Sequence, residues 1–369
     1  MSATTSTDCS ATEWWIDDEV IQLREWGTES IHRLPECPWG GVTIGSADTC
    51  ALRLVDPNGL ISRKHAWLER SRQSWNVHDL DSRNGIRIDG VRRSEGGLDP
   101  GAELGIGGFL LIPESRRFIK LRSFVARLLG YAPEKLEAVD LALRSIRLAV
   151  TRRMTLVLCG PGDMVLVAHA IHRRALGDSR PFVVCDPRRR EGQASVRSAG
   201  NVETGLAAIK RARGGSLCVW SQRLPPDFEE VRVALRDPTT RVQLIVCMQP
   251  WQRSRPPKPN LIDPIIVPPL HSRPDEIDRI ISECAEEAAA TLLTNLTLTA
   301  SDREWIVRHS AASVCEVEKG VRRILAIRQH DGDINTAARA LGMARVSLER
   351  WFGRRRWPTE QDAEAGRLP

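Results

Sequence analysis

Two stretches of the sequence carry side chains that could bind phosphate. In the first, Ser62, Arg63 and Lys64 place a hydroxyl and two cations side by side, and Arg83 and Asn84 follow further along the chain. A phosphate group needs fixed hydrogen-bond donors and positive charge, delivered from loops on a rigid scaffold. Ser62 supplies a donor, and the guanidinium of Arg63 can fork onto phosphate oxygens. These residue types predict an anion-binding site.

The second stretch, residues 334–356, reads INTAARALGMARVSLERWFGRRR and fits two helices joined by a tight turn at Gly342. We predict that apolar residues hold the two helices together: Ile334, Ala337, Ala338, Leu341, Met343, Val346, Leu348 and Phe352. The outward positions near the start of the second helix suit contacts with base edges: Arg345, Ser347, Glu349 and Arg350. The arginines that follow suit backbone phosphates: Arg354, Arg355 and Arg356.

The elements that position the first group read as β-strands. Between residues 20 and 113, short apolar runs such as GVTIG, AWLE and FLLIP alternate with Gly, Pro, Asn and Asp. This spacing is typical of a β-sandwich. The sequence therefore predicts an all-β domain whose loops carry Ser62, Arg63 and Asn84.

The β region resembles a forkhead-associated (FHA) domain. The markers are Gly45, Ser62-Arg63-Lys64-His65, Asn84-Gly85 and the closing Asp89-Gly90. The resemblance implies recognition of phosphothreonine, with Ser62 and Arg63 on the phosphate and Asn84 on the peptide backbone. It also implies that His65 braces the loops and that Gly85 permits a tight turn.

One position departs from the FHA pattern. The family usually has Arg directly after the first glycine, where it contacts the phosphate, and this chain has Ser46 after Gly45. Arg63, Lys64 or Arg83 would have to compensate. The alternative is a sandwich that binds a protein partner without reading phosphate.

The middle of the chain alternates strand and helix. TLVLCG, PFVVCD, SLCVWS and VQLIVCM are continuous apolar runs, as buried parallel strands require, and helical segments separate them. This α/β pattern resembles the AAA+ domain of bacterial enhancer-binding proteins, the sigma-54 activators. TLVLCGPGDMVLVAHAIHRRA matches the Walker A region of that family, and RARGGSLCVWSQRLPP matches its Walker B region.

The segments that resemble Walker A and Walker B lack the residues that phosphoryl transfer needs. Gly160 and Gly162 remain, but Met164 stands at the position of the Walker A lysine. Trp220 and Ser221 replace the Walker B carboxylates, and Cys315 replaces the arginine of the second sensor. A P-loop enzyme needs that lysine on the phosphates and a carboxylate to hold Mg²⁺. We therefore predict a core without ATPase activity, and leave open whether nucleotide still binds.

The C-terminal pair of predicted helices resembles the Fis-type DNA-binding domain that ends many enhancer-binding proteins. The resemblance agrees with that of the middle domain and implies binding to double-stranded DNA. Ala344 occupies the position where a serine cap is common, so the second helix lacks that cap. The alternative is a helical hairpin whose arginines are merely solvated.

Composition narrows the function further. The net charge is +6, with acidic residues gathered near the N-terminus and arginines near the C-terminus, which favours a polyanionic partner. Nine cysteines occur without any CxxC spacing, so we predict neither a zinc site nor disulfides, and no metal or cofactor. No apolar run is long enough for a membrane span, and the N-terminus lacks the apolar core of a signal peptide. These features predict a cytoplasmic protein.

The sequence thus predicts a multidomain chain that is a DNA-binding regulator and not an enzyme. It would receive a phosphothreonine-containing partner, such as a Ser/Thr kinase or its substrate, and would act as a homo-oligomer, at least a dimer. The alternative is a signalling scaffold that does not bind DNA. The expected divisions are a disordered acidic N-terminus (1–19), FHA sandwich (20–115), AAA+-like α/β domain (116–272), helical lid (273–329), helix-turn-helix (330–358) and tail (359–369).

Overall fold

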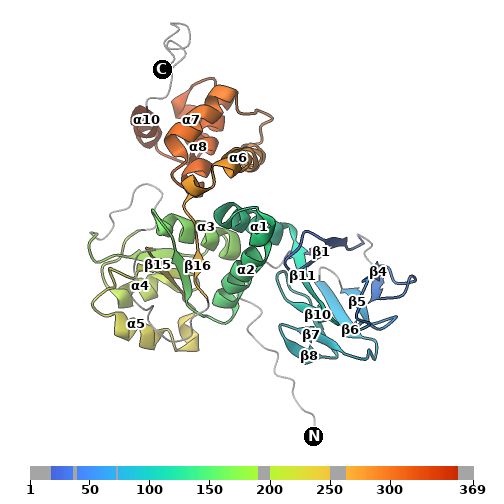
Figure 1. The fold of residues 1–369 in the computed structure, drawn as a ribbon. Helices are drawn as coiled ribbons and strands as arrows, with labels where there is room; N and C mark the ends of the chain where they lie inside the picture. The colour runs from blue at the N-terminus through green and yellow to red at the C-terminus, as the bar shows by residue number, and fades with distance from the viewer. Residues whose placement is uncertain (1–17, 36–39, 72–73, 190–199, 250–262, 356–369) are drawn as a thin grey trace.

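A computed structural model describes residues 18–35, 40–71, 74–189, 200–249 and 263–355. The chain forms a β-sandwich, an α/β part and a C-terminal group of helices (Figure 1). The predictions for the N-terminus, for the tail and for Arg356 concern residues outside the described ranges, apart from Asp18 and Glu19.

The sandwich consists of two sheets, as the strand pattern predicted. The first sheet has the order β2 (Ile31–Arg33), β1 (Val20–Glu25), β11 (Phe109–Ser115), β10 (Leu104–Ile106), β7 (Ile86–Ile88) and β8 (Val91–Arg93). The second has the order β4 (Leu52–Arg53), β3 (Gly41–Gly45), β5 (Ala66–Ser71), β6 (Ser74–Asp79) and β9 (Glu95–Gly97). Alternate residues of both sheets point inward and form one core, which contains Leu23, Leu68, Trp75 and Leu104.

The α/β part follows directly. Two helices, α1 (Arg116–Leu129) and α2 (Leu136–Thr151), precede a parallel sheet and lie between it and the sandwich (Figure 1). The sheet order is β13 (Phe182–Cys185), β14 (Ser216–Trp220), β15 (Gln243–Met248), β12 (Leu156–Cys159) and β16 (Ile265–Ile266). The other helices of this part are α3 (Met164–Leu176), α4 (Gly205–Ala212) and α5 (Phe228–Ala234). Every strand pair in this sheet is parallel, as the continuous apolar runs predicted.

The C-terminal part is helical, but not throughout residues 273–357 as the sequence suggested. Its helices are α6 (Ile277–Leu292), α7 (Ala300–Ser310), α8 (Val314–Gln329), α9 (Ile334–Ala340) and α10 (Arg345–Gly353). Leu293 adopts a left-handed conformation with φ of 54°, which ends α6, and an extended segment then leads to α7. Thr299 and Asp302 form a capping box that starts α7.

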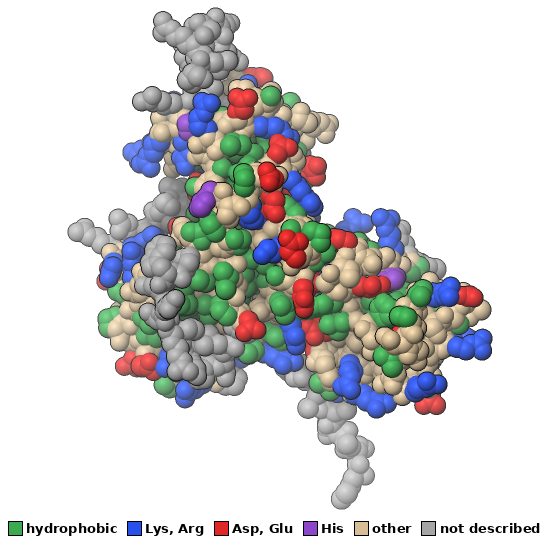
Figure 2. Space-filling view, in the orientation of Figure 1, with side chains coloured by type: hydrophobic (Ala, Val, Ile, Leu, Met, Phe, Trp, Pro, Cys, Tyr) green, Lys and Arg blue, Asp and Glu red, His purple; other side chains and the backbone are tan. Residues whose placement is uncertain are grey.

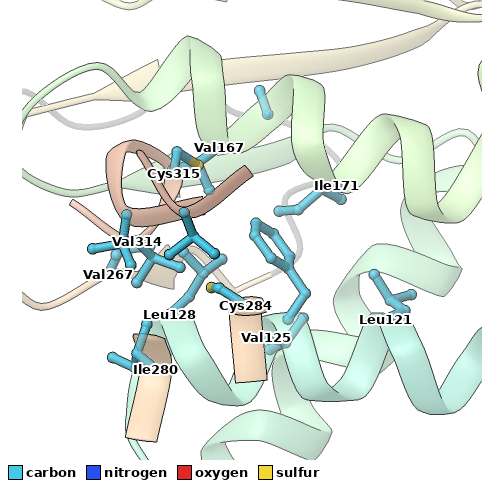
Figure 3. Packing of buried hydrophobic residues seen from close by; sticks show 14 of the residues in the cluster. Leu121, Val125, Leu128, Val167, Ile171, Val267, Ile280, Cys284, Val314 and Cys315 are labelled. Atoms are coloured by element: carbon cyan, nitrogen blue, oxygen red, sulfur yellow. The ribbon is translucent and has the colours of Figure 1, made fainter. Parts of the chain in front are cut away.

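One hydrophobic cluster joins the α/β part to the helical part. It runs from Ile112 at the edge of the sandwich through α1, α3, α6 and α8 to Phe352 in α10. Figure 3 shows its centre, where Val314 and Cys315 of α8 share the cluster with Val167 of α3 and with Val267. The two parts therefore share a core and do not merely touch.

A buried ion network joins the sandwich to α2. The side chain of Arg24 is 2% exposed and lies between two carboxylates that are also buried. Its Nε donates to Glu114 Oε1 at 2.8 Å, and its terminal nitrogens donate to both oxygens of Asp140 on α2. Asp140 also accepts a hydrogen bond of 2.7 Å from the backbone of Gly27. The satisfied charges fix the angle at which the sandwich meets the helix.

Asp140→Ala tests this junction, because it leaves the buried guanidinium with Glu114 as its remaining carboxylate partner. Removing one member of a buried ion pair costs about 3–5 kcal/mol, and we expect a loss near the lower value. The measurement is urea unfolding of the full chain followed by tryptophan fluorescence. The control is Glu137→Ala, an exposed position on the same helix, which should cost less than about 1 kcal/mol. Equal losses in the two variants would show that the network does not hold the junction.

Candidate functional site

The predicted phosphate-binding residues of the sandwich lie on loops at the same end. Gly45 ends β3, and its neighbour Ser46 donates its backbone N–H to Ser62 O at 3.1 Å. A side chain at Gly45 could not fit, because its Cβ would lie 2.3 Å from the carbonyl oxygen of Arg63. The backbone N–H of Arg83 donates to the hydroxyl of Ser62 at 3.1 Å. The three loops therefore meet around Ser62.

His65 holds these loops together from within. Its side chain is fully buried, and its Nδ1 accepts a hydrogen bond of 3.1 Å from the backbone of Ser62. Its Nε2 lies 3.2 Å from the carbonyl oxygen of Gly85, in the neighbouring loop. Gly85 itself has φ of 69°, a conformation that favours glycine. His65 thus sets the distance between the two loops that carry Arg63 and Asn84.

The cations of this site point to solvent. Arg63, Lys64 and Arg83 are exposed, and their side chains make no hydrogen bond or ion pair with any residue that the structure describes. Asn84 is exposed as well, and its amide donates to Leu60 O at 2.7 Å, which steadies the side chain. Unpaired cations beside an ordered amide are the arrangement that a phosphorylated peptide requires.

Ser46 stands at the position of the family arginine. Its hydroxyl donates inward to Ile61 O at 3.2 Å and so helps to close the loop between β4 and β5. Sequence reasoning also missed Asp56 in this loop, whose carboxylate accepts backbone hydrogen bonds from Asn58, Leu60 and Ile61. The signal was present as the turn sequence Asp-Pro-Asn-Gly at residues 56–59.

Apolar side chains lie at the residues of the α/β part that resemble a Walker A loop. Met164 is the first residue of α3 and is 2% exposed. A Cβ at Gly160 would lie 2.9 Å from the sulfur of Met164 and 3.0 Å from the carbonyl oxygen of Val267. Gly162 has φ of 77° and is exposed. The sulfur of Met164 and the backbone of Val267 thus pack closely against Gly160.

A cleft of about 360 Å³ remains at the carboxyl ends of the strands, next to Gly162 and Trp220. Its two arginines share one acidic partner, because Arg223 lies 3.1 Å and Arg189 3.6 Å from the buried carboxylate of Asp186. Ser221 is held by a backbone hydrogen bond to Cys247 O. Among the residues that line the cleft, Asp163 carries the one carboxylate, and its Oδ1 accepts a hydrogen bond of 3.1 Å from the backbone N–H of Val165 as the N-cap of α3.

In the helical part, α9 and α10 pack against each other across the turn at Gly342, whose φ is 61°. Ala337, Ala338 and Leu341 are buried on one side, and Leu348, Trp351 and Phe352 on the other. The prediction for Val346 was wrong, because this side chain is 51% exposed. The reason is the helical period: residues 348, 351 and 352 share the inner face, and position 346 falls on the opposite side.

The predicted base-contacting residues lie on the outer side of α10. Arg345 and Arg350 are exposed, and Ser347 and Glu349 are half-buried. Arg345 donates to Glu349 one turn along the helix, at 2.5 Å. Basic side chains gather at the end of the helical part where α10 lies (Figure 2). The side chains that would meet a DNA groove are thus on one exposed helix.

The arginines after α10 differ in their surroundings. Arg354 is exposed, whereas the guanidinium of Arg355 lies 4.7 Å from the ring centre of Trp351. Arg355 also donates to His309 O and to Glu316 at 3.3 Å each. Arg355 therefore lies between α7, α8 and α10. Arg354 is the more exposed of the two arginines and so is better able to contact a backbone phosphate.

Other classes of site find no support in the described part of the chain. No group of three His, Cys, Asp or Glu side chains there is arranged to hold a metal ion. No helix among the described residues is both long enough and apolar enough to span a membrane.

Comparisons with known proteins match the sandwich. The FHA domain family matches residues 42–107, and no curated protein matches the chain. A structure titled "Structural and functional analysis of phosphothreonine-dependent FHA domain interactions" is 25% identical, covers 26% of this chain and 95% of its own, and has a TM-score of 0.23. The FhaA FHA domain, complexed with the intracellular domain of Rv3910, is 26% identical, with coverages of 25% and 96% and a TM-score of 0.22.

A third similar structure is the Slr1951 protein from Synechocystis sp. It is 25% identical, covers 26% of this chain and 94% of its own, and has a TM-score of 0.23. Each of these structures thus covers about a quarter of the present chain. Taken together with the loop geometry, the family match shows that this chain carries an FHA domain at residues 42–107.

Proposed function

We propose that this protein is a DNA-binding transcription regulator that receives a phosphothreonine-containing partner through its FHA domain. The observation that supports phosphothreonine recognition is the set of unpaired cations on the loops around Ser62, above all Arg63 and Arg83. Similar FHA domains are described as phosphothreonine-dependent. A protein kinase or one of its substrates is the partner that this chemistry suits.

The proposed DNA binding is supported by the packing of α9 against α10. The inner faces are buried, Gly342 makes the turn, and Arg345 and Arg350 remain exposed on the second helix. This is the arrangement in which a helix-turn-helix presents its recognition helix to the major groove. Such domains act on paired half-sites, so we propose a homo-oligomer that is at least a dimer.

In this proposal the α/β part is an AAA+-like core that does not hydrolyse ATP. The support is the buried Met164 beside Gly160 and the pairing of the cleft arginines with Asp186. The core would act as a rigid spacer between the two binding ends.

A scaffold that does not bind DNA is the second candidate. It is favoured by the partners that two of the predicted DNA contacts already have, Arg345 with Glu349 and Arg355 with Glu316. Salt dependence distinguishes the two functions. A DNA regulator binds duplex with an affinity that falls steeply as salt rises, and a scaffold is not retained on DNA at physiological salt.

The phosphate site is tested with Arg63→Ala and a phosphothreonine peptide library. Losing one charge-assisted contact should weaken binding by about 1.5–3 kcal/mol, the range for hydrogen bonds to charged groups. Ser46→Arg should tighten binding, because it restores a forked cation beside the phosphate. Titration calorimetry with matched phosphorylated and unphosphorylated peptides is the measurement. The control is Arg93→Ala, an exposed arginine on β8; equal affinities for the two peptides would mean that the domain does not read phosphate.

The DNA site is tested with Arg345→Ala and Arg350→Ala on a preferred duplex found by genome-wide footprinting. Each should cost about 1–3 kcal/mol and relax the base preference, because base contacts carry specificity. Arg354→Ala should instead weaken all duplexes alike and flatten the salt dependence. Electrophoretic mobility shifts at several salt concentrations separate these effects. Indistinguishable behaviour of the two classes of variant would contradict the assigned roles.

We expect no ATP hydrolysis by the full chain with Mg²⁺, because neither the phosphate-binding lysine nor a metal-binding carboxylate is present. Met164→Lys alone should not restore it, since Mg²⁺ would still lack its ligand. Phosphate release is the measurement, and a variant lacking residues 160–165 sets the background. Turnover above that background would refute the proposed inactive core.

A further inference from the structure

A second cleft lies between α3 and helices α6 and α8. Its volume is about 540 Å³, and Leu341, just after α9, lines one side. The residues assigned above to the phosphopeptide and DNA sites do not line it. Its lysine and arginine side chains come from two helices: Arg173 and Arg174 from α3, and Lys319, Arg322 and Arg323 from α8.

Arg322 is the cation that lacks a partner. Its Nε is buried and has no hydrogen-bond partner in the described part of the chain. Burial lowers the pKa of Arg322, and the like charge of Arg173 lowers it further, against the opposing effect of Asp178. A charged guanidinium that is partly buried and lies near another cation costs free energy. A bound anion would offset that cost.

The neighbouring cations form one exposed and one half-buried ion pair. Arg173 binds Asp178, whose side chain is 72% exposed, and Lys319 lies 2.9 Å from Glu316, whose side chain is 25% exposed. Exposed pairs such as the first contribute little and exchange readily. Arg173 can therefore turn toward a ligand at small cost.

Two acidic residues of the cleft, Glu287 and Glu318, are paired with arginines other than the three proposed to bind the ligand. Glu318 accepts from Arg174 at 3.0 Å and from Arg127 at 3.3 Å, and Glu287 accepts from Arg127 at 2.7 Å. Arg127 is almost fully buried behind them. These carboxylates are thus neutralised by two other arginines, and the positive charge of Arg322 remains in excess.

His169 completes the site on α3. Burial, and then the charge of Arg173, lower the pKa of His169, so its ring is neutral near pH 7. Its ring centre lies 4.8 Å from that of Phe182, which fixes the orientation of the imidazole. A neutral imidazole adds a hydrogen-bonding group without adding to the repulsion among the cations.

From this arrangement we propose that the cleft binds the di- or triphosphate group of a small anionic ligand, held by Arg322, Arg173 and Lys319. The ligand would contact α3 and α8 together, and so stabilise the junction between the α/β and helical parts. The site does not depend on DNA binding or on phosphopeptide binding, so its test is independent of the proposed function. Inorganic polyphosphate and nucleotides both carry such a phosphate chain, and the experiment below distinguishes these two kinds of ligand.

The test is isothermal titration of the full chain with sodium tripolyphosphate, with ATP in the presence of EDTA, and with adenosine, at about 0.15 M salt. We expect saturable one-to-one binding of tripolyphosphate and of ATP, and none of adenosine. Tripolyphosphate and ATP of equal affinity would identify the phosphate chain as the recognised group. Tighter binding of ATP by tenfold or more would identify a nucleotide as the source. Absence of saturable binding by both would overturn the proposal.

Variants assign the binding to this cleft. Arg322→Gln should weaken tripolyphosphate binding at least tenfold, and Asp178→Asn should strengthen it by removing a competing carboxylate. Arg232→Gln on α5, whose partner Glu229 lies outside the cleft, is the control and should leave the affinity unchanged.

Melting of the unliganded protein gives a second readout. Arg322→Gln should raise the melting temperature of the free chain, because it removes an unpartnered charge, and should abolish the rise that tripolyphosphate causes in the parent. A lower melting temperature together with unchanged tripolyphosphate affinity would show that Arg322 has only a structural role, and would refute the site. If Arg322→Gln does not fold, Lys319→Gln with the same titration decides the question.

Discussion

The shared hydrophobic cluster constrains everything that the helical part can do. Because Val314 and Cys315 of α8 are buried in one core with Val167 of α3, the helical part cannot swing away without exposing that core to water. Here the apolar contact is continuous, so α9 and α10 have a fixed direction relative to the parallel sheet.

The two proposed binding surfaces are each supported by ordered residues behind them. The loops around Ser62 are ordered from within by His65 and Asp56, while Arg63 and Arg83 stay exposed at the rim. At the other end, Trp351 packs against Trp305 of α7 with ring centres 5.4 Å apart, which seats α10 on the helices before it. Both surfaces are therefore preorganised, and a ligand at either one meets side chains whose backbone does not need to rearrange.

Local pattern was enough to predict most elements and the loop residues of the FHA domain. Strand alternation, turn residues and the markers at Gly45 and Asn84 are properties of neighbouring residues in the chain. The network of Arg24 was invisible to such reasoning, because Arg24 and Asp140 are 116 residues apart. The inward place of Arg355 was missed for a related reason, because it depends on contacts with His309 and Glu316 of the preceding helices. The exposure of Val346, by contrast, follows from the helical period and could have been predicted from the sequence.

The buried network of Arg24 also bears on where the chain can be divided. The sequence suggests a boundary after residue 115, where the last strand of the sandwich gives way to α1. A fragment that ends there would keep Arg24 and Glu114 but lose Asp140, and would open to solvent a guanidinium that is 2% exposed in the whole chain. A fragment that keeps both the sandwich and this ion network must therefore extend beyond residue 115 to include Asp140 in α2.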